Sequence, residues 1–187
     1  MRFTRLKLEG AWVIEPERHE DERGFFARVW CAREFEEQGL EPRLVQASVA
    51  YSRKKGTLRG MHFQVPPHGE VKIVRCTRGA IHDVIIDLRP DSPTYLSWEG
   101  VLLSAENRAA LYVPKGFAHG YQTMEDDTEV FYQMSEFYAP GAEGGIRWDD
   151  PFFDIDWPHA EVRIVSEKDQ RLPPFERDLA DVFRQAE

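Results

Sequence analysis

The chain has 187 residues, of which 42% are hydrophobic and 30% are charged. This length and composition are those of an ordinary globular protein with enough residues for one well-buried domain. Its 24 Lys and Arg residues against 33 Asp and Glu residues give a formal net charge of −9. Such a charge repels polyphosphate chains and anionic lipid surfaces, which argues against nucleic acid or a membrane as the main partner. A small anionic ligand stays compatible, since a few Arg and Lys side chains reverse the potential inside a cleft.

The cysteines and the N-terminal sequence indicate the compartment. Cys31 and Cys76 are the only cysteines, too few for a disulfide scaffold. Residues 1–6 lack the apolar run of a signal peptide, and no apolar stretch approaches the roughly 18 residues of a membrane span. We therefore expect a cytoplasmic protein that forms one domain over residues 1–187.

Short runs of β-branched and aromatic residues, separated by Gly and Pro, fill the chain between two candidate helices. The helices are predicted at 32–38, closed by Gly39, and at about 176–185. Strands are predicted, in chain order, at 58–64, 71–76, 80–87, 98–103, 109–113, 120–123 and 129–134, with turns at 77–79 and 90–93 and a tight corner at 114–116. Short strands at this spacing predict an all-β sandwich or barrel rather than alternating βα units.

The predicted strand 58–64 carries the densest polar cluster in an apolar setting. Period-two alternation predicts two faces, one with Arg59, Met61 and Phe63 and the other with Gly60, His62 and Gln64. His62 is then either a hydrogen-bonded core histidine or an inward-facing functional group. Lys72, in an alternating strand, points either to solvent or into a polar pocket.

Further polar residues follow the corner at 114–116. His119 is expected where the corner brings side chains to the mouth of a barrel. Tyr132 and Tyr138 supply two phenols, although a strand tyrosine usually packs with its hydroxyl at the rim. These residues are compatible with acid–base chemistry by His, Tyr, Lys and carboxylate groups.

Other reaction classes lack their sequence signatures. No two of the six histidines stand one residue apart on a strand, which disfavours a metal site of the kind that β-barrels build from inward-facing histidines. The Gly-x-Ser-x-Gly elbow, the phosphate-binding loop and the Gly-x-Gly-x-x-Gly fingerprint do not occur. Nothing near the two cysteines indicates a thiol activated by a base. We expect neither a metal nor an organic cofactor.

Ordered sequence blocks over most of the chain carry a resemblance to a known family. The blocks are residues 21–26 (DERGFF), 56–64 (GTLRGMHFQ), 72–75 (KIVR), 83–89 (DVIIDLR), 103–107 (LSAEN), 114–120 (PKGFAHG) and 148–151 (WDDP). In these blocks the chain resembles the dTDP-4-dehydrorhamnose 3,5-epimerases. The resemblance implies a cupin-type jelly roll (a double-stranded β-helix) with short terminal helices, usually a homodimer. It also implies metal-free action on a nucleotide-linked 4-keto-6-deoxyhexose.

The resemblance also implies roles for individual residues. His62 corresponds to the general base that removes the proton next to the ketone, and Asp169 to its carboxylate partner. Lys72 corresponds to the cation near the developing enolate oxygen, and Tyr132 to the acid that reprotonates from the opposite face. The implied substrate-binding positions are Arg23, Arg28, Gln46, Ser48, Arg59, His119, Tyr138, Glu143 and Lys168. These residue types suit enolate formation, because a buried ammonium stabilises the enolate and an imidazole takes up a proton near neutral pH.

Four positions depart from the pattern of the family: His19, Arg28, Ser48 and Glu70. The first three correspond to positions around the nucleotide base. The sequence therefore leaves open a C3-only or C5-only epimerase, an enzyme that uses a CDP- or other NDP-sugar, and a 3,4-ketoisomerase. An alternative of a different class is a non-catalytic barrel that binds a sugar nucleotide.

Overall fold

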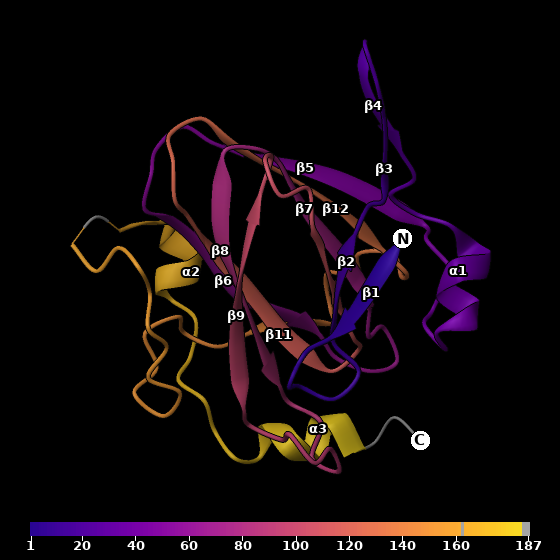
Figure 1. Ribbon diagram of the computed structural model, residues 1–187. Helices are drawn as coiled ribbons and strands as arrows, with labels where there is room; N and C mark the ends of the chain where they lie inside the picture. The colour runs from indigo at the N-terminus through magenta and orange to yellow at the C-terminus, as the bar shows by residue number, and fades with distance from the viewer. Residues whose placement is uncertain (162, 185–187) are drawn as a thin grey trace.

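The computed structural model describes residues 1–161 and 163–184, and strands dominate it (Figure 1). The strands are β1 (Arg2–Arg5), β2 (Trp12–Glu15), β3 (Arg18–Asp21), β4 (Gly24–Ala27), β5 (Gln46–Ser52), β6 (Thr57–Gln64), β7 (Lys72–Arg78), β8 (Ala80–Asp87), β9 (Trp98–Ser104), β10 (Ala110–Val113), β11 (Phe117–Thr123), β12 (Thr128–Met134), β13 (Glu143–Gly145) and β14 (Ile164–Val165). The helices are α1 (Ala32–Glu37), α2 (Glu167–Gln170) and α3 (Leu179–Arg184). None of these helices has the length and apolar character that a membrane crossing requires.

Two sheets form the body of the molecule. The first has the strand order β1-β2-β10-β7-β12-β5, and the second has the order β13-β6-β11-β8-β9, with β14 added to β6. Neighbouring strands are antiparallel, apart from the parallel pair of β14 and β6. The cupin-type jelly roll expected from the sequence is confirmed.

Strand β8 explains how one sheet supports two apolar layers. Ile81 and Ile85 point between the two sheets, and Val84 and Ile86 point to the outer face of the second sheet. All four side chains are fully buried. A strand covered on both faces has a nearly continuous apolar sequence, as residues 84–86 do.

Each sheet also has an outer cover. Helix α1 covers part of the first sheet, where Phe35 packs against Tyr112 and against Phe3. The segment after β13 wraps the outer face of the second sheet, and its Trp157 and Phe153 belong to the apolar layer that contains Met61. Figure 1 shows α1 and α2 on opposite sides of the molecule and α3 below the sheets.

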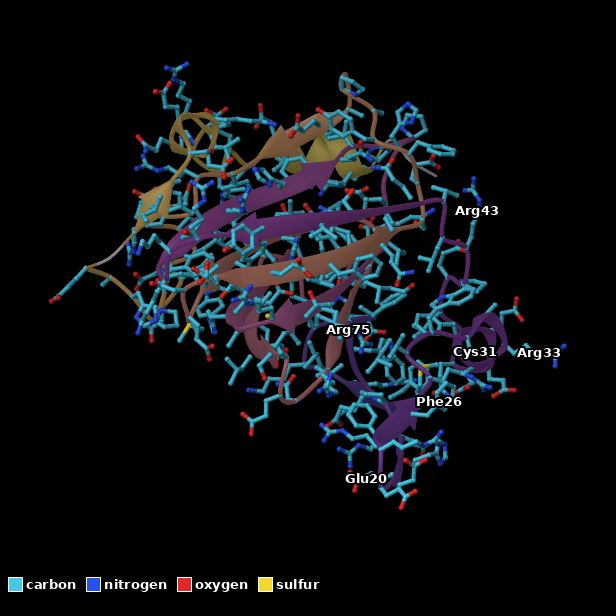
Figure 2. The ribbon with its side chains drawn as sticks, turned by 90° about the horizontal axis from the view of Figure 1, so that it is seen from above. Glu20, Phe26, Cys31, Arg33, Arg43 and Arg75 are labelled. Carbon is cyan, nitrogen blue, oxygen red and sulfur yellow. The ribbon has the colours of Figure 1, made fainter. Side chains whose placement is uncertain are left out.

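The hairpin of β3 and β4 stands apart from both sheets. Its strands pair only with each other, and it projects away from the sandwich in Figures 1 and 2. Phe26 on β4 is 74% exposed. The ring of Phe25 lies under the guanidinium groups of Arg18 and Arg108, at 5.3 and 4.6 Å, which anchors the base of the hairpin.

The predicted elements agree with these bounds in most places. The strand predicted at 80–87 is confirmed as β8, and the corner at 114–116 joins β10 to β11. The turn predicted at 77–79 is wrong in extent, because β7 continues to Arg78 and Gly79 alone takes the left-handed conformation that reverses the chain (φ +73°). The C-terminal helix begins at Leu179 instead of residue 176, and its predicted end at Gln185 lies outside the described residues.

Candidate active site

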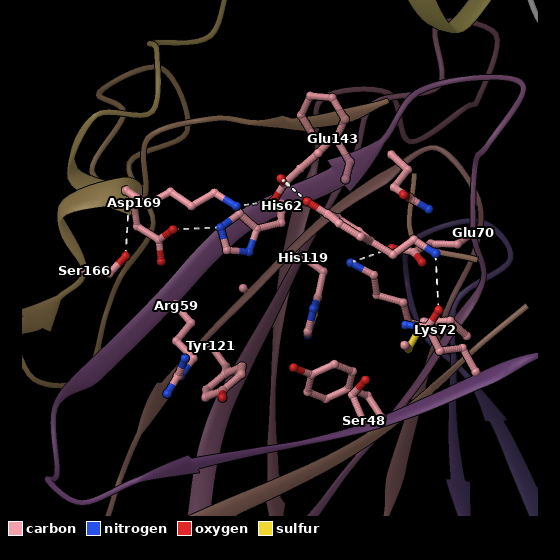
Figure 3. A pocket seen from close by; sticks show the side chains of 18 residues that line it. Ser48, Arg59, His62, Glu70, Lys72, His119, Tyr121, Glu143, Ser166 and Asp169 are labelled. Atoms are coloured by element: carbon pink, nitrogen blue, oxygen red, sulfur yellow. Dashed lines mark hydrogen bonds and ion pairs between the residues drawn. The ribbon is translucent and has the colours of Figure 1, made fainter. Parts of the chain in front are cut away.

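A cavity of about 420 Å³ opens between the two sheets, within the size range of small-molecule sites. The first sheet contributes Gln46 and Ser48 from β5, Lys72 from β7, and Tyr132 and Met134 from β12. The second sheet contributes Arg59 and His62 from β6, His119 and Tyr121 from β11, and Glu143 from β13. Tyr138 from a loop and Lys168 and Asp169 from α2 complete the wall (Figure 3).

An extra residue in β6 sets which side chains face this cavity. His62 pairs with His119 and Arg59 pairs with Tyr121, so three steps along β6 match two steps along β11. This β-bulge interrupts the alternation and turns Arg59 to the same side as His62. The expectation that Arg59 faces the other way, with Met61 and Phe63, is therefore wrong.

The bulge requires a close approach of two backbones. Gly60 has φ +122°, and a Cβ atom on it would lie 2.5 Å from Cα of Gly120. Only glycine combines this conformation with that separation. The short polar run around Gly60 thus builds the floor of the cavity.

A histidine–carboxylate pair lies on this floor. Nε2 of His62 is 2.8 Å from Oδ1 of Asp169, and the backbone amide of Gly60 donates a hydrogen bond to Oδ2 at 3.2 Å. Asp169 itself is held by α2, whose N-cap Ser166 accepts a hydrogen bond from the Asp169 amide. The contact to Asp169 through Nε2 leaves Nδ1 of His62 as the ring nitrogen available to a ligand.

The pKa of Asp169 lies below its ordinary value. Burial acts to raise this pKa, but the hydrogen bond and charge of His62 and the hydrogen bonds from Gly60 and Ser166 outweigh it. The folded protein therefore keeps Asp169 ionised beside the imidazole.

A second histidine–carboxylate pair lies next to the first. Nε2 of His119 is 2.7 Å from Oδ1 of Asp83, and both side chains are buried. Strands β8 and β11 are antiparallel neighbours, and the pair Asp83–Tyr121 is in register, so Asp83 and His119 share the inner face. This contact fixes the orientation of the His119 ring.

The opposite wall carries a phenol and an ammonium group. Tyr132 lies on β12 and Lys72 on the neighbouring β7, both in the first sheet. Nζ of Lys72 is 3.2 Å from Oε1 of Glu70. Burial raises the pKa of the Tyr132 phenol, the charge of Arg59 opposes this shift, and the charge of Glu70 adds to it. The phenol is thus a proton donor at neutral pH, on the sheet that faces His62.

Charged residues also connect the segments at the mouth of the cavity. Glu143 accepts hydrogen bonds from Lys168 and, at 2.8 Å, from the hydroxyl of Tyr138. The Lys168 hydrogen bond is the main cause of the lowered pKa of Glu143. The backbone amide of Tyr138 donates to Oε1 of Gln46, which ties this loop to β5.

Arg59 differs from the other basic side chains of the cavity. It donates to Ser52 Oγ at 3.4 Å and to the carbonyl of Tyr51 at 3.2 Å. Over residues 1–161 and 163–184, no carboxylate lies within ion-pair distance of Arg59. Its charge is therefore available to an anionic ligand.

Two predicted binding residues lie outside the cavity of their own chain. Arg23 sits at the tip of the hairpin, where it pairs with Asp21. Arg28 follows β4 and pairs with Glu34 of α1 at 2.9 Å. The other predicted catalytic and binding residues all line the cavity.

Some residues that shape the cavity had no local signal in the sequence. Asp83 reads as part of a core strand, and Tyr121 as an ordinary packing residue. Glu70 differs from the family pattern, and its spacing of two from Lys72 is the signal that could have found it, because residues two apart share a face of an extended segment. Within the described part of the chain, no cluster of three or more His, Cys, Asp or Glu side chains is arranged to hold a metal ion.

The ionised Asp169 leads to a pH-dependent prediction for stability. A carboxyl whose folded pKa is lowered stabilises the fold above its unfolded pKa of about 3.9, and this contribution is lost as the pH falls through the folded value. Asp169→Asn is expected to lower the free energy of unfolding by about 1–3 kcal/mol at pH 7. The difference from the unsubstituted protein should shrink below about pH 4. Urea unfolding across pH 3–8 measures this difference, and Asp154→Asn in an exposed loop is the control. A deficit that stays constant across this range would contradict the expectation.

Comparisons with known proteins agree with the geometry. A family model described as dTDP-4-dehydrorhamnose 3,5-epimerase matches residues 5–177. The dTDP-4-dehydrorhamnose 3,5-epimerase of Methanothermobacter thermautotrophicus is 47% identical over 177 residues, which cover 93% of this chain and 94% of that protein.

Solved structures are similar over the same extent. The Bacillus anthracis dTDP-4-dehydrorhamnose 3,5-epimerase with TDP and PPi bound has a TM-score of 0.90 and 40% identity, covering 93% of this chain and 99% of that one. A 3′-monoepimerase from Streptomyces bikiniensis in complex with dTDP-quinovose has a TM-score of 0.84 and 35% identity, covering 96% and 89%. By its sequence and its fold alike, the chain belongs to the dTDP-4-dehydrorhamnose 3,5-epimerase family of enzymes.

Proposed function

We propose that this protein inverts the carbons next to the ketone of a dTDP-linked 4-keto-6-deoxyhexose, at C3 and C5, through an enolate. The observation that carries the proposal is the arrangement of proton-transfer groups in the cavity. An imidazole paired with a carboxylate lies on the side of one sheet, and a phenol and an ammonium group from adjacent strands of the other sheet line the same cavity. Inversion at carbon needs such groups on both faces of the sugar ring.

In the first step His62 is the general base. Nδ1 takes the proton from the carbon next to the ketone, and the electron pair of the broken C–H bond forms the enolate. Asp169 accepts a hydrogen bond from Nε2–H, so it fixes the tautomer with a free Nδ1 and stabilises the imidazolium. The largely buried ammonium of Lys72 stabilises the negative charge on the enolate oxygen.

In the second step Tyr132 is the acid. Its hydroxyl proton passes to the same carbon from the opposite face, which restores the ketone with inverted configuration. The phenolate and the imidazolium then return to their resting states by exchange with solvent. Because the ketone activates both neighbouring carbons, the same groups serve C3 and C5 in turn.

The cations of the cavity support a nucleoside diphosphate as the carrier. Arg59, without a carboxylate partner in the described residues, offers two guanidinium nitrogens to phosphate oxygens. The relative with TDP and PPi bound and the relative with dTDP-quinovose support dTDP as the nucleotide.

A second candidate is inversion at C3 alone. The similar structure of a 3′-monoepimerase supports it, since that protein shares the fold over 96% of this chain. The number of protons exchanged in deuterated water distinguishes the two functions. Incorporation at both C3 and C5 supports the 3,5-epimerase, and incorporation at C3 alone supports the monoepimerase.

Substitution of His62 tests the base. The protein is incubated with dTDP-4-keto-6-deoxyglucose in deuterated water, and the sugar should incorporate deuterium. Proton NMR measures this incorporation. His62→Ala should lower incorporation at every carbon by at least about 100-fold, the usual contribution of a general base. His68→Ala, exposed and outside the cavity, is the matched control. Exchange by His62→Ala at the rate of the unsubstituted protein would remove His62 as the base.

Substitution of Tyr132 separates the two proton transfers. Tyr132→Phe should lower net inversion by about 100-fold and deuterium incorporation by less than about tenfold. The reason is that a proton can leave and return on the His62 side without inversion. NMR distinguishes washed-in substrate from inverted product, and Tyr95→Phe outside the cavity is the control. An equal loss of both rates would contradict the role of Tyr132.

We further propose that the protein works as a homodimer in the cytoplasm, as the sequence predicts. Strand β5 lies at the edge of the first sheet, and its Val49 and Tyr51 side chains are 58% and 44% exposed. Exposed apolar side chains on an edge strand favour association. The substrate-binding roles predicted for Arg23 and Arg28 require the hairpin of one copy to approach the cavity of the other.

The molecular mass in solution tests the dimer. Light scattering should give about twice the 21.8 kDa of one chain. Val49→Asp should lower the mass toward that of the monomer, because it buries a charge at the interface. Leu102→Asp, equally exposed on β9 of the other sheet, should leave the mass unchanged. A monomeric mass for the unsubstituted protein would refute this proposal.

A further inference from the structure

Glu70 introduces a carboxylate into the wall of the cavity, directly beside Lys72. The two side chains are 12% and 14% exposed, and Oε1 of Glu70 lies 3.2 Å from Nζ of Lys72 (Figure 3). Both residues line the cavity. The proton transfers proposed above use Lys72 but assign nothing to Glu70.

The backbone holds this pair in place. Val71, between the two residues, donates its amide hydrogen to Ser135 Oγ at 2.8 Å, and its carbonyl accepts from the Ser135 amide at 3.0 Å. Val71 and Ser135 are both buried. Glu70 and Lys72 are two residues apart in an extended segment, so their side chains project to the same side.

Most basic side chains of the cavity have a carboxylate partner. His62 pairs with Asp169, His119 with Asp83, Lys168 with Glu143, and Lys72 with Glu70. Arg59 lacks such a partner among the residues that the structure describes. Among these residues, an incoming diphosphate therefore meets one cation without a carboxylate partner, on β6, whereas the ammonium groups of Lys72 and Lys168 each have one.

This pairing of basic side chains with carboxylates bears on whether the diphosphate or the keto group of a substrate reaches Lys72. A diphosphate carries more negative charge than a ketone, so an unpaired ammonium at Lys72 would compete with Arg59 for it. We propose that Glu70 is a positioning residue, which withdraws Lys72 from diphosphate binding and so keeps it for the keto group of the sugar. The inference rests on the proposed function for the identity of that keto group.

The environment of Tyr132 agrees with this role. The groups that face the phenol come from several elements: Arg59 on β6, Tyr121 on β11, Ser48 on β5, Lys72 on β7 and Glu70 before it. The charge of Glu70 adds to burial in raising the pKa of Tyr132, against the opposing charge of Arg59. Glu70 thus also favours the protonated phenol beside the reacting carbon.

The test is the affinity of the protein for inorganic pyrophosphate, measured by calorimetry. Glu70→Gln keeps the shape of the side chain but removes its charge, and pyrophosphate should then bind roughly tenfold more tightly. Glu70→Asp keeps the charge and should bind as the unsubstituted protein does. Glu136→Gln, which removes a carboxylate paired with Arg43 outside the cavity, is the matched control.

A double variant shows whether the effect passes through Lys72. Lys72→Met combined with Glu70→Gln should bind pyrophosphate no more tightly than Lys72→Met alone. Tightening that persists in the double variant, or unchanged affinity in Glu70→Gln, would overturn the inference. A lowered melting temperature would show that the Glu70→Gln protein is misfolded. In that case the comparison of a charged with an uncharged side chain uses Glu70→Asp and Glu70→Ala.

Turnover gives a second measurement. Glu70→Gln should lower the kcat of deuterium incorporation about tenfold and lower the KM with it, since the substrate binds more tightly but with its keto group displaced. Unchanged kcat would count against the inference. Absence of exchange with the unsubstituted protein would refute the proposed function instead, and the pyrophosphate titration would still decide the role of Glu70.

Discussion

The cavity depends on one extra residue in β6. Because three steps along this strand match two along β11, Arg59 and His62 lie on the same side of the sheet. Regular alternation would direct Arg59 into the apolar layer between the second sheet and the C-terminal segment, where its guanidinium would be buried among apolar side chains. Gly60 makes the bulge possible, since its backbone passes close to Gly120. The same bulge directs the amide of Gly60 to Asp169, so the imidazole, its carboxylate and the guanidinium of Arg59 all derive their positions from one irregularity.

Charge pairing is the basis of the substrate selectivity that we propose for the cavity. A protein with a net charge of −9 attracts a dianionic ligand only where local cations exceed local carboxylates. In this cavity the excess lies at Arg59, whereas Lys72 and Lys168 have carboxylate partners. Under the proposed function, this arrangement separates the recognition of the diphosphate from the chemistry at the sugar ring within a cavity of about 420 Å³.

The sequence predicted those features that depend on local pattern. Strand β8, with apolar residues on both faces, was predicted over its full length, and the resemblance identified His62 and Asp169 although they lie 107 residues apart. Strand alternation predicted the wrong orientation for Arg59, because a bulge leaves no trace in it, whereas the resemblance placed Arg59 among the substrate-binding positions. The burial of Lys72 depends on Glu70 and on the neighbouring strands β10 and β12, which come together only in the fold. Asp83 was missed as a partner for the same reason.

Strand β14 and helix α2 bring the last part of the active site from the far end of the chain. Residues 164–165 pair in parallel with the start of β6, and this pairing sets Asp169 beside the imidazole. On a ribosome, the two sheets are synthesised before this segment leaves the exit tunnel. A nascent chain that had already formed its sandwich would therefore carry a histidine without its acidic partner until residues 164–169 reached β6.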